Sequence, residues 1–390
     1  MGLISSLRMT LIALGTKLYE VVEGKAKILA PDPSAYSREG KYDPSWAPVF
    51  YNPKMTFNRD ASVIAVSLLS PKSILDSMSA TGIRGIRYNL ESVSPDETIF
   101  NDKNPAAITL LRINVERNGL KNYKITQLDA NVAMHQFKVD FTDVDPFGSP
   151  SPFTLGAVAS TRRGGVIALT ATDLAPLEGS SRASCFRKYG VRTSKLSYSK
   201  EAGLRILLGK VVRDAALFER GVVPLFSFYK EYYYRLFVKL EPGAKRADKS
   251  LQELGTMYEC TKCGYIFLDT DPCIRSCPLC GGSLLSSGPA WTGSINDEVF
   301  LDKMRSVLEK FSYLKSYSEL SYLLNLLKNE NKYKLYYNLS VIASKLRTNM
   351  RPIHKVLECL GDASRTHFNN VGIKTSREFK EVVECLKSSY

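Results

Sequence analysis

Histidine is scarce in this chain, since 390 residues contain only His135, His354 and His367. None of them belongs to a recognisable Ser/His/Asp or Cys/His arrangement, on which most nucleophilic hydrolysis depends. The scarcity therefore disfavours a hydrolase. His367 lies between Thr366 and Phe368. A contact of His367 with RNA is one interpretation, and a loop histidine whose hydrogen bonds are satisfied is the favoured one.

Long apolar runs are also missing. The N-terminal stretch Leu11-Ile12-Ala13-Leu14 is too short to span a bilayer and lacks a convincing small-residue cleavage site. We interpret it as a frayed or buried leader, with Met9 as an alternative start. The sequence therefore predicts a cytoplasmic protein with no membrane partner. No feature of it points to an obligate protein partner.

Acidic residues are outnumbered, 39 Asp and Glu against 53 Lys and Arg, which gives a net charge of +14 and a pI near 9.3. The excess is uneven, because residues 181–220 alone hold ten basic residues against three acidic ones. Such a balance favours a polyanionic partner. Charge alone leaves nucleic acid, a membrane surface and simple solubility open.

Short apolar runs alternate with helical segments between residues 62 and 240. Four successive strands are predicted to end next to an acidic residue, at Asp76, Asp102, Asp129 and Asp145. Further strands are predicted at 165–170 and 232–240, and a helix at 104–118, with Ile108, Leu111 and Val115 on one face. This alternation predicts an α/β fold with a parallel, doubly wound sheet. Ligands bind such sheets beyond the carboxyl ends of the strands.

Three domains are predicted. Residues 1–245 form the α/β domain, and the Pro-Gly stretch at 241–246 marks its end. Residues 246–290 form a cysteine-rich insertion. Residues 291–390 form a mainly helical domain with a winged-helix-like pattern at 338–360. Tyrosines and lysines at 311–337 are suited to stacking on RNA bases, although packing between helices explains them equally well.

The first candidate site is the run from Asp76 to Gly85, where a strand enters a helix through a turn that contains Gly82. Backbone N–H groups of such a turn approach a ligand closely. Asp102, 20 residues beyond Gly82, is placed to accept the ribose hydroxyls of a nucleoside cofactor. Asp129 and Ala130 are placed near its adenine amine. A helix N-cap is the alternative role for each aspartate taken singly.

The second candidate site is the run from Asp145 to Phe153, DPFGSPSPF. Asp145 and the carbonyl that follows it, that of Pro146, can accept the N–H bonds of an exocyclic amine and aim its lone pair, with Asp145 taking the released proton. Phe147 can stack on the base that carries the amine. This arrangement suits alkylation of a poorly nucleophilic nitrogen, where orientation matters most. The alternative is a rigid, proline-rich turn.

The third candidate site consists of two C-x-x-C pairs, Cys260 with Cys263 and Cys277 with Cys280. Their spacing predicts a tetrahedral zinc ribbon with four thiolates and no open position, so the zinc would be structural. Cys273 is an alternative to Cys277 as a ligand. The remaining cysteines are expected to be isolated, buried, small apolar residues: Cys185, Cys359 and Cys385.

The chain resembles the archaeal–eukaryotic tRNA (guanine-26, N2)-dimethyltransferase family along nearly its whole length. The matching runs, in family order, are VxEGKAKIL (21–29), PVFYNPKMTFNRD (48–60), LDSMSATGIRGIRYNLE (75–91), DPFGSPSPF (145–153), GGVIALTATDLAPL (164–177), FRKYG (186–190), FSFYKEYYYRLFVKL (226–240) and RTHFNNVGIKTS (365–376). The departures are modest: Ser180-Ser181 replaces a His-Pro-like stretch, and only some members of the family contain the zinc ribbon.

The resemblance implies a class I methyltransferase fold, S-adenosylmethionine as donor and tRNA as partner. It implies cofactor contacts from Arg59, Arg84, Asp102, Asp129 and Ala130. It also implies Asp145 as the catalytic acid, with Phe50 and Phe147 clamping the flipped guanine. Two alternatives stay open: an enzyme of this fold that acts on another base, and a non-catalytic zinc-ribbon protein that binds RNA.

Overall fold

The computed structural model describes residues 17–39, 41–92, 95–270 and 274–387. The apolar stretch at 11–14 and Cys273 lie outside these ranges. The described chain forms two compact units whose segments alternate along the sequence. The first unit holds the described residues up to Pro146, Gly156–Ala168 and Lys303–Ser321. The second holds Phe147–Leu155, Leu169–Asp302 and the described residues from 322 on.

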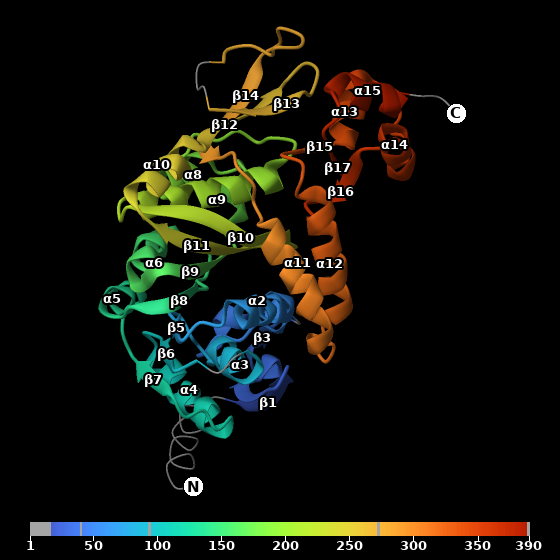
Figure 1. Cartoon of the computed structure of the whole chain (residues 1–390). Helices are drawn as coiled ribbons and strands as arrows, with labels where there is room; N and C mark the ends of the chain where they lie inside the picture. The colour runs from blue at the N-terminus through green and yellow to red at the C-terminus, as the bar shows by residue number, and fades with distance from the viewer. Residues whose placement is uncertain (1–16, 40, 93–94, 271–273, 388–390) are drawn as a thin grey trace. The chain divides into compact units, whose positions relative to one another are not determined.

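The main sheet is mixed and has seven strands. They are β5 (Ser73–Asp76), β6 (Glu97–Asn101), β7 (Tyr123–Thr126), β8 (Val139–Val144), β9 (Thr161–Ala171), β10 (Arg220–Lys230) and β11 (Tyr233–Pro242). Their order is β10-β11-β9-β8-β5-β6-β7 (Figure 1). β5 pairs in parallel with β6 and β8, and β6 with β7, whereas β10 and β11 are antiparallel. The chain runs outward from β5 to β7 and returns to β8 on the other side of β5, which confirms the doubly wound α/β fold.

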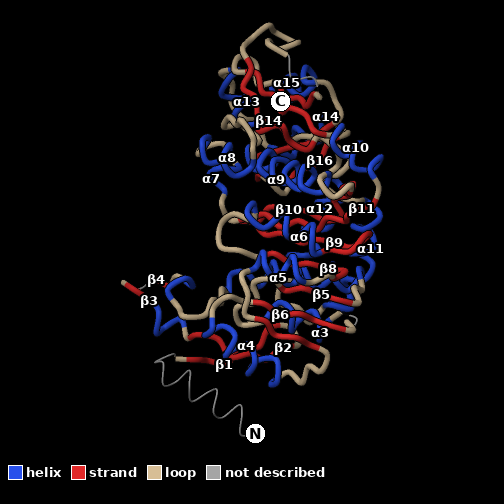
Figure 2. The backbone as a smooth tube through the Cα atoms, turned by 90° about the vertical axis from the view of Figure 1, so that its left-hand side faces the viewer, coloured by secondary structure: helices blue, strands red, loops and turns tan. Residues whose placement is uncertain are grey.

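Helices alternate with these strands in the first unit (Figure 2). They are α2 (Thr56–Leu69), α3 (Ile83–Glu91), α4 (Pro105–Arg117), α5 (Ala130–Gln136) and α6 (Thr154–Ser160), the last of which begins in the second unit. The predicted helix at 104–118 is therefore confirmed. A hairpin of β1 (Leu18–Glu23) and β2 (Ala26–Pro31) precedes them. Short elements connect the hairpin to α2: η1 (Pro33–Tyr36), β3 (Ser37–Arg38), β4 (Lys41–Tyr42), η2 (Pro44–Trp46) and η3 (Pro53–Met55).

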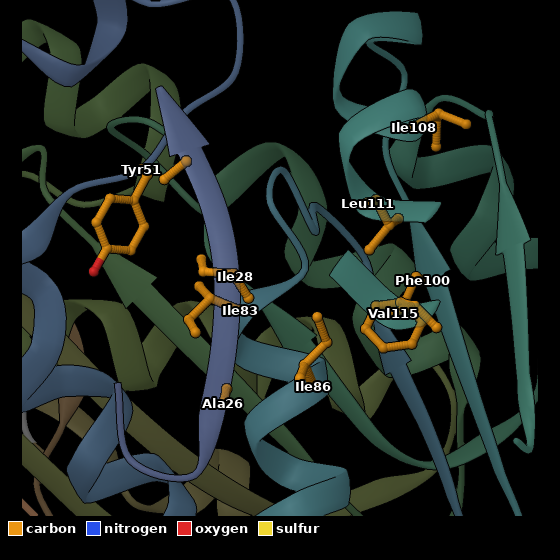
Figure 3. Packing of buried hydrophobic residues seen from close by; sticks show 10 residues of the cluster. Ala26, Ile28, Tyr51, Ile83, Ile86, Phe100, Ile108, Leu111 and Val115 are labelled. Atoms are coloured by element: carbon orange, nitrogen blue, oxygen red, sulfur yellow. The ribbon is translucent and has the colours of Figure 1, made fainter. Parts of the chain in front are cut away.

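An apolar core joins β2 to α3 and α4 (Figure 3). Ile108, Leu111 and Val115, the predicted face of α4, are buried in it beside Phe100 and Ile86. Each such side chain contributes about 1.5 to 3 kcal/mol when fully buried. This core positions the turn between β5 and α3, because Gly82 packs directly on it: a Cβ there would lie 2.3 Å from Leu111 Cδ1.

In the described part of the second unit, β9 is followed by a group of helices around β10 and β11 and then by a small sheet. The helices are α7 (Leu174–Leu177), α8 (Arg182–Tyr189), α9 (Ser199–Ala216) and α10 (Ala244–Gln252). The small sheet has the order β13-β12-β14, with strands β12 (Leu254–Cys260), β13 (Ile266–Asp269) and β14 (Leu284–Trp291). A further short helix, η4 (Ser151–Phe153), lies in the proline-rich run after β8.

The C-terminal residues are mainly helical, as predicted. Their elements are α11 (Glu298–Val307), η5 (Leu308–Phe311), α12 (Tyr317–Glu330), β15 (Tyr336–Asn338), α13 (Leu339–Leu346), α14 (Ile353–Leu360), β16 (Ala363–Thr366), β17 (Asn369–Thr375) and α15 (Phe379–Lys387) (Figure 1). The helices α13 and α14 are followed by the antiparallel pair β16 and β17, and the winged-helix-like assignment stays a prediction. Among the described residues, no helix has the length and apolar composition that a membrane crossing requires.

One cysteine prediction was wrong. Cys359 of α14 and Cys385 of α15 form a disulfide, and Cys359 is exposed. The two residues are 26 positions apart and meet only because α14 and α15 pack together. Cys185 is a buried free thiol, as predicted.

Candidate active site at the carboxyl ends of the parallel strands

The turn between β5 and α3 contains two residues with a positive φ, a backbone conformation that few residue types adopt readily. Gly82 has a φ of +80° and caps α3, and Ala80 has a φ of +48°. Ser79 Oγ donates to the carbonyl of Asp76 (2.9 Å) and accepts from the N–H of Asn101 (3.1 Å), which ties the turn to β6. These bonds fix the path of the backbone where a ligand would approach it.

Asp102 follows β6 and is held by two backbone donors. Its Oδ2 accepts from the N–H of Ala80 and its Oδ1 from the N–H of Asn104, both at 2.9 Å. The side chain stays partly exposed. Each carboxylate oxygen offers two acceptor positions, so one on each remains for hydroxyl donors. This geometry fits the predicted contact with a ribose.

Asp129 caps α5, as the alternative interpretation proposed. Its Oδ1 accepts from the N–H of Asn131 (2.9 Å), and the side chain is exposed. Ala130 is the first residue of the helix and is buried. An N-cap role leaves a carboxylate oxygen on the solvent side, so it does not conflict with a contact to a cofactor. That contact stays a prediction.

Arg84 meets Asp145, and both are predicted site residues. Arg84 Nη2 lies 2.5 Å from Asp145 Oδ2, and the arginine is 5% exposed. Its Nη1 donates to Asn58 Oδ1 (3.0 Å) and Ser62 Oγ (3.2 Å), which lie one turn apart on α2. The guanidinium is therefore held from behind while it orients the carboxylate that follows β8.

Two further acids, Asp76 and Asp143, lie around Arg84 and were not assigned a role from the sequence. They are register partners on β5 and β8, and both are buried. Asp143 accepts from Tyr88 Oη (2.5 Å) and lies 3.8 Å from Arg84 Nε. Burial, with help from the charge of Asp143, raises the pKa of Asp76 to about 7, although Arg84 opposes the shift. The only sequence signal for them was their place at the ends of buried strands.

Arg59, a predicted cofactor contact, is buried and pairs with Glu23 of β1. Arg59 Nε and Nη2 each lie 2.6 Å from one carboxylate oxygen of Glu23. Burial disfavours ionisation of Glu23, but Arg59 and Arg87 outweigh it and lower the pKa of this carboxyl to about 2. Arg87 also pairs with Asp60 and Glu91. This network ties β1 to α2 and α3.

The network around Arg87 includes residues from far along the chain. Tyr313 Oη donates to Glu91 (3.0 Å), and the N–H of Ser316 donates to Asp60 (3.1 Å). Tyr313 is thus engaged within the first unit. Other tyrosines of the 311–337 segment are buried in the second unit, which favours packing over stacking on bases for them: Tyr333, Tyr336 and Tyr337.

The aromatic residues predicted to hold a base differ in exposure. Phe50 is partly buried. Pro146 is buried and ends the first unit, whereas Phe147 begins the second unit and is 66% exposed. An exposure of this size excludes a core role for Phe147. The predicted clamp stays a prediction, since it requires both rings.

The four predicted zinc ligands come together. The sulfurs of Cys260, Cys263, Cys277 and Cys280 all lie within 4.8 Å of one another. Cys260 and Cys280 are 3.5 Å apart, and Cys263 and Cys277 are 3.8 Å apart. Tetrahedral zinc with bonds of about 2.3 Å to sulfur requires roughly 3.8 Å between sulfurs. The arrangement of these four described cysteines therefore fits one zinc ion.

His367 is satisfied within the protein, as the favoured interpretation predicted. Its Nδ1 bonds the buried carboxylate of Glu330, and its Nε2 accepts from the N–H of Tyr229 (3.2 Å). Lys374 lies between Glu330 and Glu201, 3.1 Å from the latter. Both ring nitrogens are engaged, so this histidine does not offer a donor or acceptor to RNA.

Comparison with known proteins is consistent with the resemblance noted in the sequence. The sequence model of the N2,N2-dimethylguanosine tRNA methyltransferase family matches residues 24–387. A Metallosphaera sedula protein named tRNA (guanine(26)-N(2))-dimethyltransferase is 57% identical over 373 residues, covering 96% of this chain and 97% of that protein. A Saccharolobus solfataricus protein of the same name is 51% identical over 375 residues, covering 95% and 99%.

A solved structure is also similar over almost the whole chain. It is the complex of Trm1 from Pyrococcus horikoshii with S-adenosyl-L-methionine. Its sequence is 35% identical, its TM-score is 0.85, and the match covers 95% of this chain and all of that one.

Proposed function

Because the chain belongs to the N2,N2-dimethylguanosine tRNA methyltransferase family, we propose that it methylates tRNA. The reaction transfers one or two methyl groups from S-adenosylmethionine to the exocyclic N2 of guanine, at position 26. The observation that carries this is the ion pair between Arg84 and Asp145 at the switch point of the sheet. It places an oriented carboxylate where the fold binds its ligands.

Asp145 has the central chemical role in this proposal. The lone pair of guanine N2 is delocalised into the ring, so the amine must be held in line with the methyl group it attacks. Asp145 Oδ1 and the carbonyl of Pro146 accept the two N–H bonds. As the carbon–nitrogen bond forms and the sulfur–carbon bond breaks, Asp145 takes the proton that N2 loses. Arg84 pairs with Asp145 Oδ2 and fixes the direction of the carboxylate.

The described residues also fit the donor. When bound, S-adenosylmethionine supplies an activated methyl group on a sulfonium. Asp102 is suited to accept hydroxyl donors of its ribose, since two backbone N–H groups already orient its carboxylate. Asp129 and Ala130 would meet the adenine. Arg59 and Arg84 are bound to Glu23 and Asp145, so a direct contact with the donor would use their remaining donors.

Phe147 and Phe50 are proposed to hold the target guanine between their rings. A base inside folded tRNA cannot reach the strand ends, so it must leave the stack. Extrusion costs a few kcal/mol, and stacking on one aromatic ring returns about 1 to 3 kcal/mol. The exposure of Phe147 supports this role.

We further propose that the four cysteines hold one structural zinc ion. The site has no open position, so it contributes to the fold and not to the transfer. The functional division into residues 1–245 for methyl transfer, 246–290 for the zinc ribbon and 291–390 for tRNA binding belongs to the same proposal, as does a location in the cytoplasm.

Mass spectrometry of nucleosides tests the proposal directly. The protein is incubated with S-adenosylmethionine and an unmodified tRNA transcript, and a transcript with adenine at position 26 is the control. We expect N2-methylguanosine or N2,N2-dimethylguanosine from the first and none from the second. Methylation of another base, or binding without any methylated product, would reject the proposal in favour of one of the two alternatives.

A further inference from the structure

Helix α8 lies in the most one-sided stretch of the chain. Residues 179–200 contain six Lys and Arg residues and no Asp or Glu. They include the run Phe186-Arg187-Lys188-Tyr189-Gly190, to which neither the transfer chemistry nor the zinc site gives a role. The helix ends at Gly190, whose φ is +65° and whose N–H donates to the carbonyl of Phe186 (2.9 Å). One side of α8 is buried, with Cys185 and Tyr189, and the other side is exposed.

The buried side of α8 is attached to the loop that follows Asp145 and Pro146. Tyr189 Oη lies 2.8 Å from Ser149 Oγ and 2.8 Å from Asp173 Oδ1. Ser151 Oγ donates to the carbonyl of Lys188, and α8 packs on η4, which begins at Ser151. Phe147 lies two residues before Ser149, so their Cα atoms are at most about 7 Å apart. The helix and the base-binding loop therefore form one assembly within the second unit.

The outer side of α8 carries an exposed aromatic ring with a cation on it. Phe186 is 53% exposed, and the guanidinium carbon of Arg192 lies 5.5 Å from its ring centroid. The backbone of Arg192 is held by two hydrogen bonds of 3.1 Å to Gly288. Arg182, one turn before Phe186, and Arg187 are exposed as well. An aromatic ring flanked by arginines is the surface on which single-stranded bases stack.

We propose that Phe186 and Arg192 form a stacking site for the tRNA nucleobase next to the target guanine, with Arg182 and Arg187 contacting its phosphates. This inference rests on the proposed function, since it assigns a second nucleotide of the same substrate. Extrusion of the target leaves its neighbour without a stacking partner, and the Phe186–Arg192 pair replaces that partner. The absence of acidic residues from 179–200 favours a polyanion over an acidic or apolar protein segment.

Substitution of Phe186 tests the site. Phe186→Ala is expected to weaken tRNA binding by about 5- to 150-fold, the range for one lost stack. Phe186→Trp should restore it, and affinity for S-adenosylmethionine and the melting temperature should not change. Phe218→Ala is the matched control, because Phe218 is 39% exposed and carries Arg220 5.8 Å from its ring, but lies at the turn between α9 and β10. The control should bind tRNA like the wild type.

A fluorescent base locates the contact. Transcripts with 2-aminopurine on the 5′ or the 3′ side of the target guanine are titrated with wild type and Phe186→Ala. We expect one of the two signals to be quenched by the wild type and not by the variant. Equal signals for both proteins, or equal losses of affinity in Phe186→Ala and Phe218→Ala, would overturn the assignment.

Two other outcomes would also overturn it. If Phe186→Ala abolishes a concentration-dependent self-association without changing tRNA affinity, the surface binds a second copy of the chain. If the wild type methylates guanine N2 and Phe186→Ala retains wild-type affinity, the stacking site is wrong while the proposed function stands. A wild-type protein that forms no methylated guanine would instead reject the function itself.

Discussion

At the scale of single residues, Asp145 carries the most specific expectation. Asp145→Ala should lower the rate of methyl transfer by about 10² to 10⁴, because it removes both the orienting acceptor and the proton acceptor. Single-turnover kinetics with saturating S-adenosylmethionine measure the effect. Donor affinity and melting temperature serve as controls and should stay near the wild-type values. Turnover close to wild type would remove Asp145 from the mechanism.

Asp76 gives a pH-dependent expectation. Its carboxyl is buried, and its pKa of about 7 lies well above the value near 4 of an unfolded chain. The folded state therefore binds more protons between about pH 4 and 7, and stability is lost as pH rises through this window. Asp76→Asn removes the ionisation while its amide oxygen can still accept from Gly85. The variant should be more stable than wild type at pH 8, with a flatter slope below pH 7.

Thermal unfolding of the ligand-free protein between pH 5 and 8.5 checks this. The slope of the free energy of unfolding against pH should differ between wild type and Asp76→Asn by close to 1.4 kcal/mol per pH unit where only Asp76 titrates. Parallel curves for the two proteins would show that Asp76 is ionised throughout.

The sequence predicted which acids end the strands, but not which groups they meet. Asp145 and Arg84 were both expected in the site, for separate reasons. Their ion pair joins residues 61 positions apart and depends on side-chain placement that no local pattern specifies. Glu23 and Asp143 were missed for the same reason. The sequence does not show which arginine pairs with a buried acid in a strand.

At the scale of elements, the sequence predicted the cluster of four cysteines but not the disulfide between Cys359 and Cys385. Regular C-x-x-C spacing predicts a metal knuckle, because each pair closes within one turn. Gly264 (φ +85°) and Gly281 (φ +67°) complete those turns. Strands β5 to β9 were also predicted from apolar runs, whereas β10 was missed.

Cysteine substitution tests the ribbon. Cys277→Ser should lower bound zinc from about one equivalent per chain to far less, because three thiolates hold zinc more weakly than four. Metal analysis of purified protein measures this, and Cys185→Ser, a buried free thiol elsewhere, is the control. A wild-type zinc content near zero would reject the ribbon as a metal site.

The disulfide between α14 and α15 should stabilise the C-terminal residues. A closed loop of this length contributes about 3.5 kcal/mol through the entropy of the unfolded chain. Cys359→Ser should therefore lower the denaturant midpoint, and a reductant should lower the wild-type midpoint but not that of the variant. Identical midpoints in all four measurements would contradict a contribution from this bond.

At the scale of the whole molecule, the positive charge is expected to govern tRNA binding. Each neutralised phosphate contributes roughly 0.7 to 0.9 to the slope of log K against log salt. Replacing Arg182 and Arg187 with Ala should flatten the slope by up to about 1.8. Lys188 should contribute less, because its ammonium lies 3.2 Å from Asp173. An unchanged slope in the double variant would place the phosphates elsewhere, in the C-terminal residues.

The bond between Tyr313 and Glu91 has a consequence for how the protein is made. The two residues are 222 positions apart, yet both belong to the first compact unit. A ribosome that adds 5 to 20 residues per second needs roughly 10 to 45 s to supply Tyr313 after Glu91 has emerged. Throughout that interval the ion network of Arg87, Asp60 and Glu91 lacks its hydrogen bonds from Tyr313 and Ser316. The first unit is thus begun early in synthesis and completed only when most of the second has been translated.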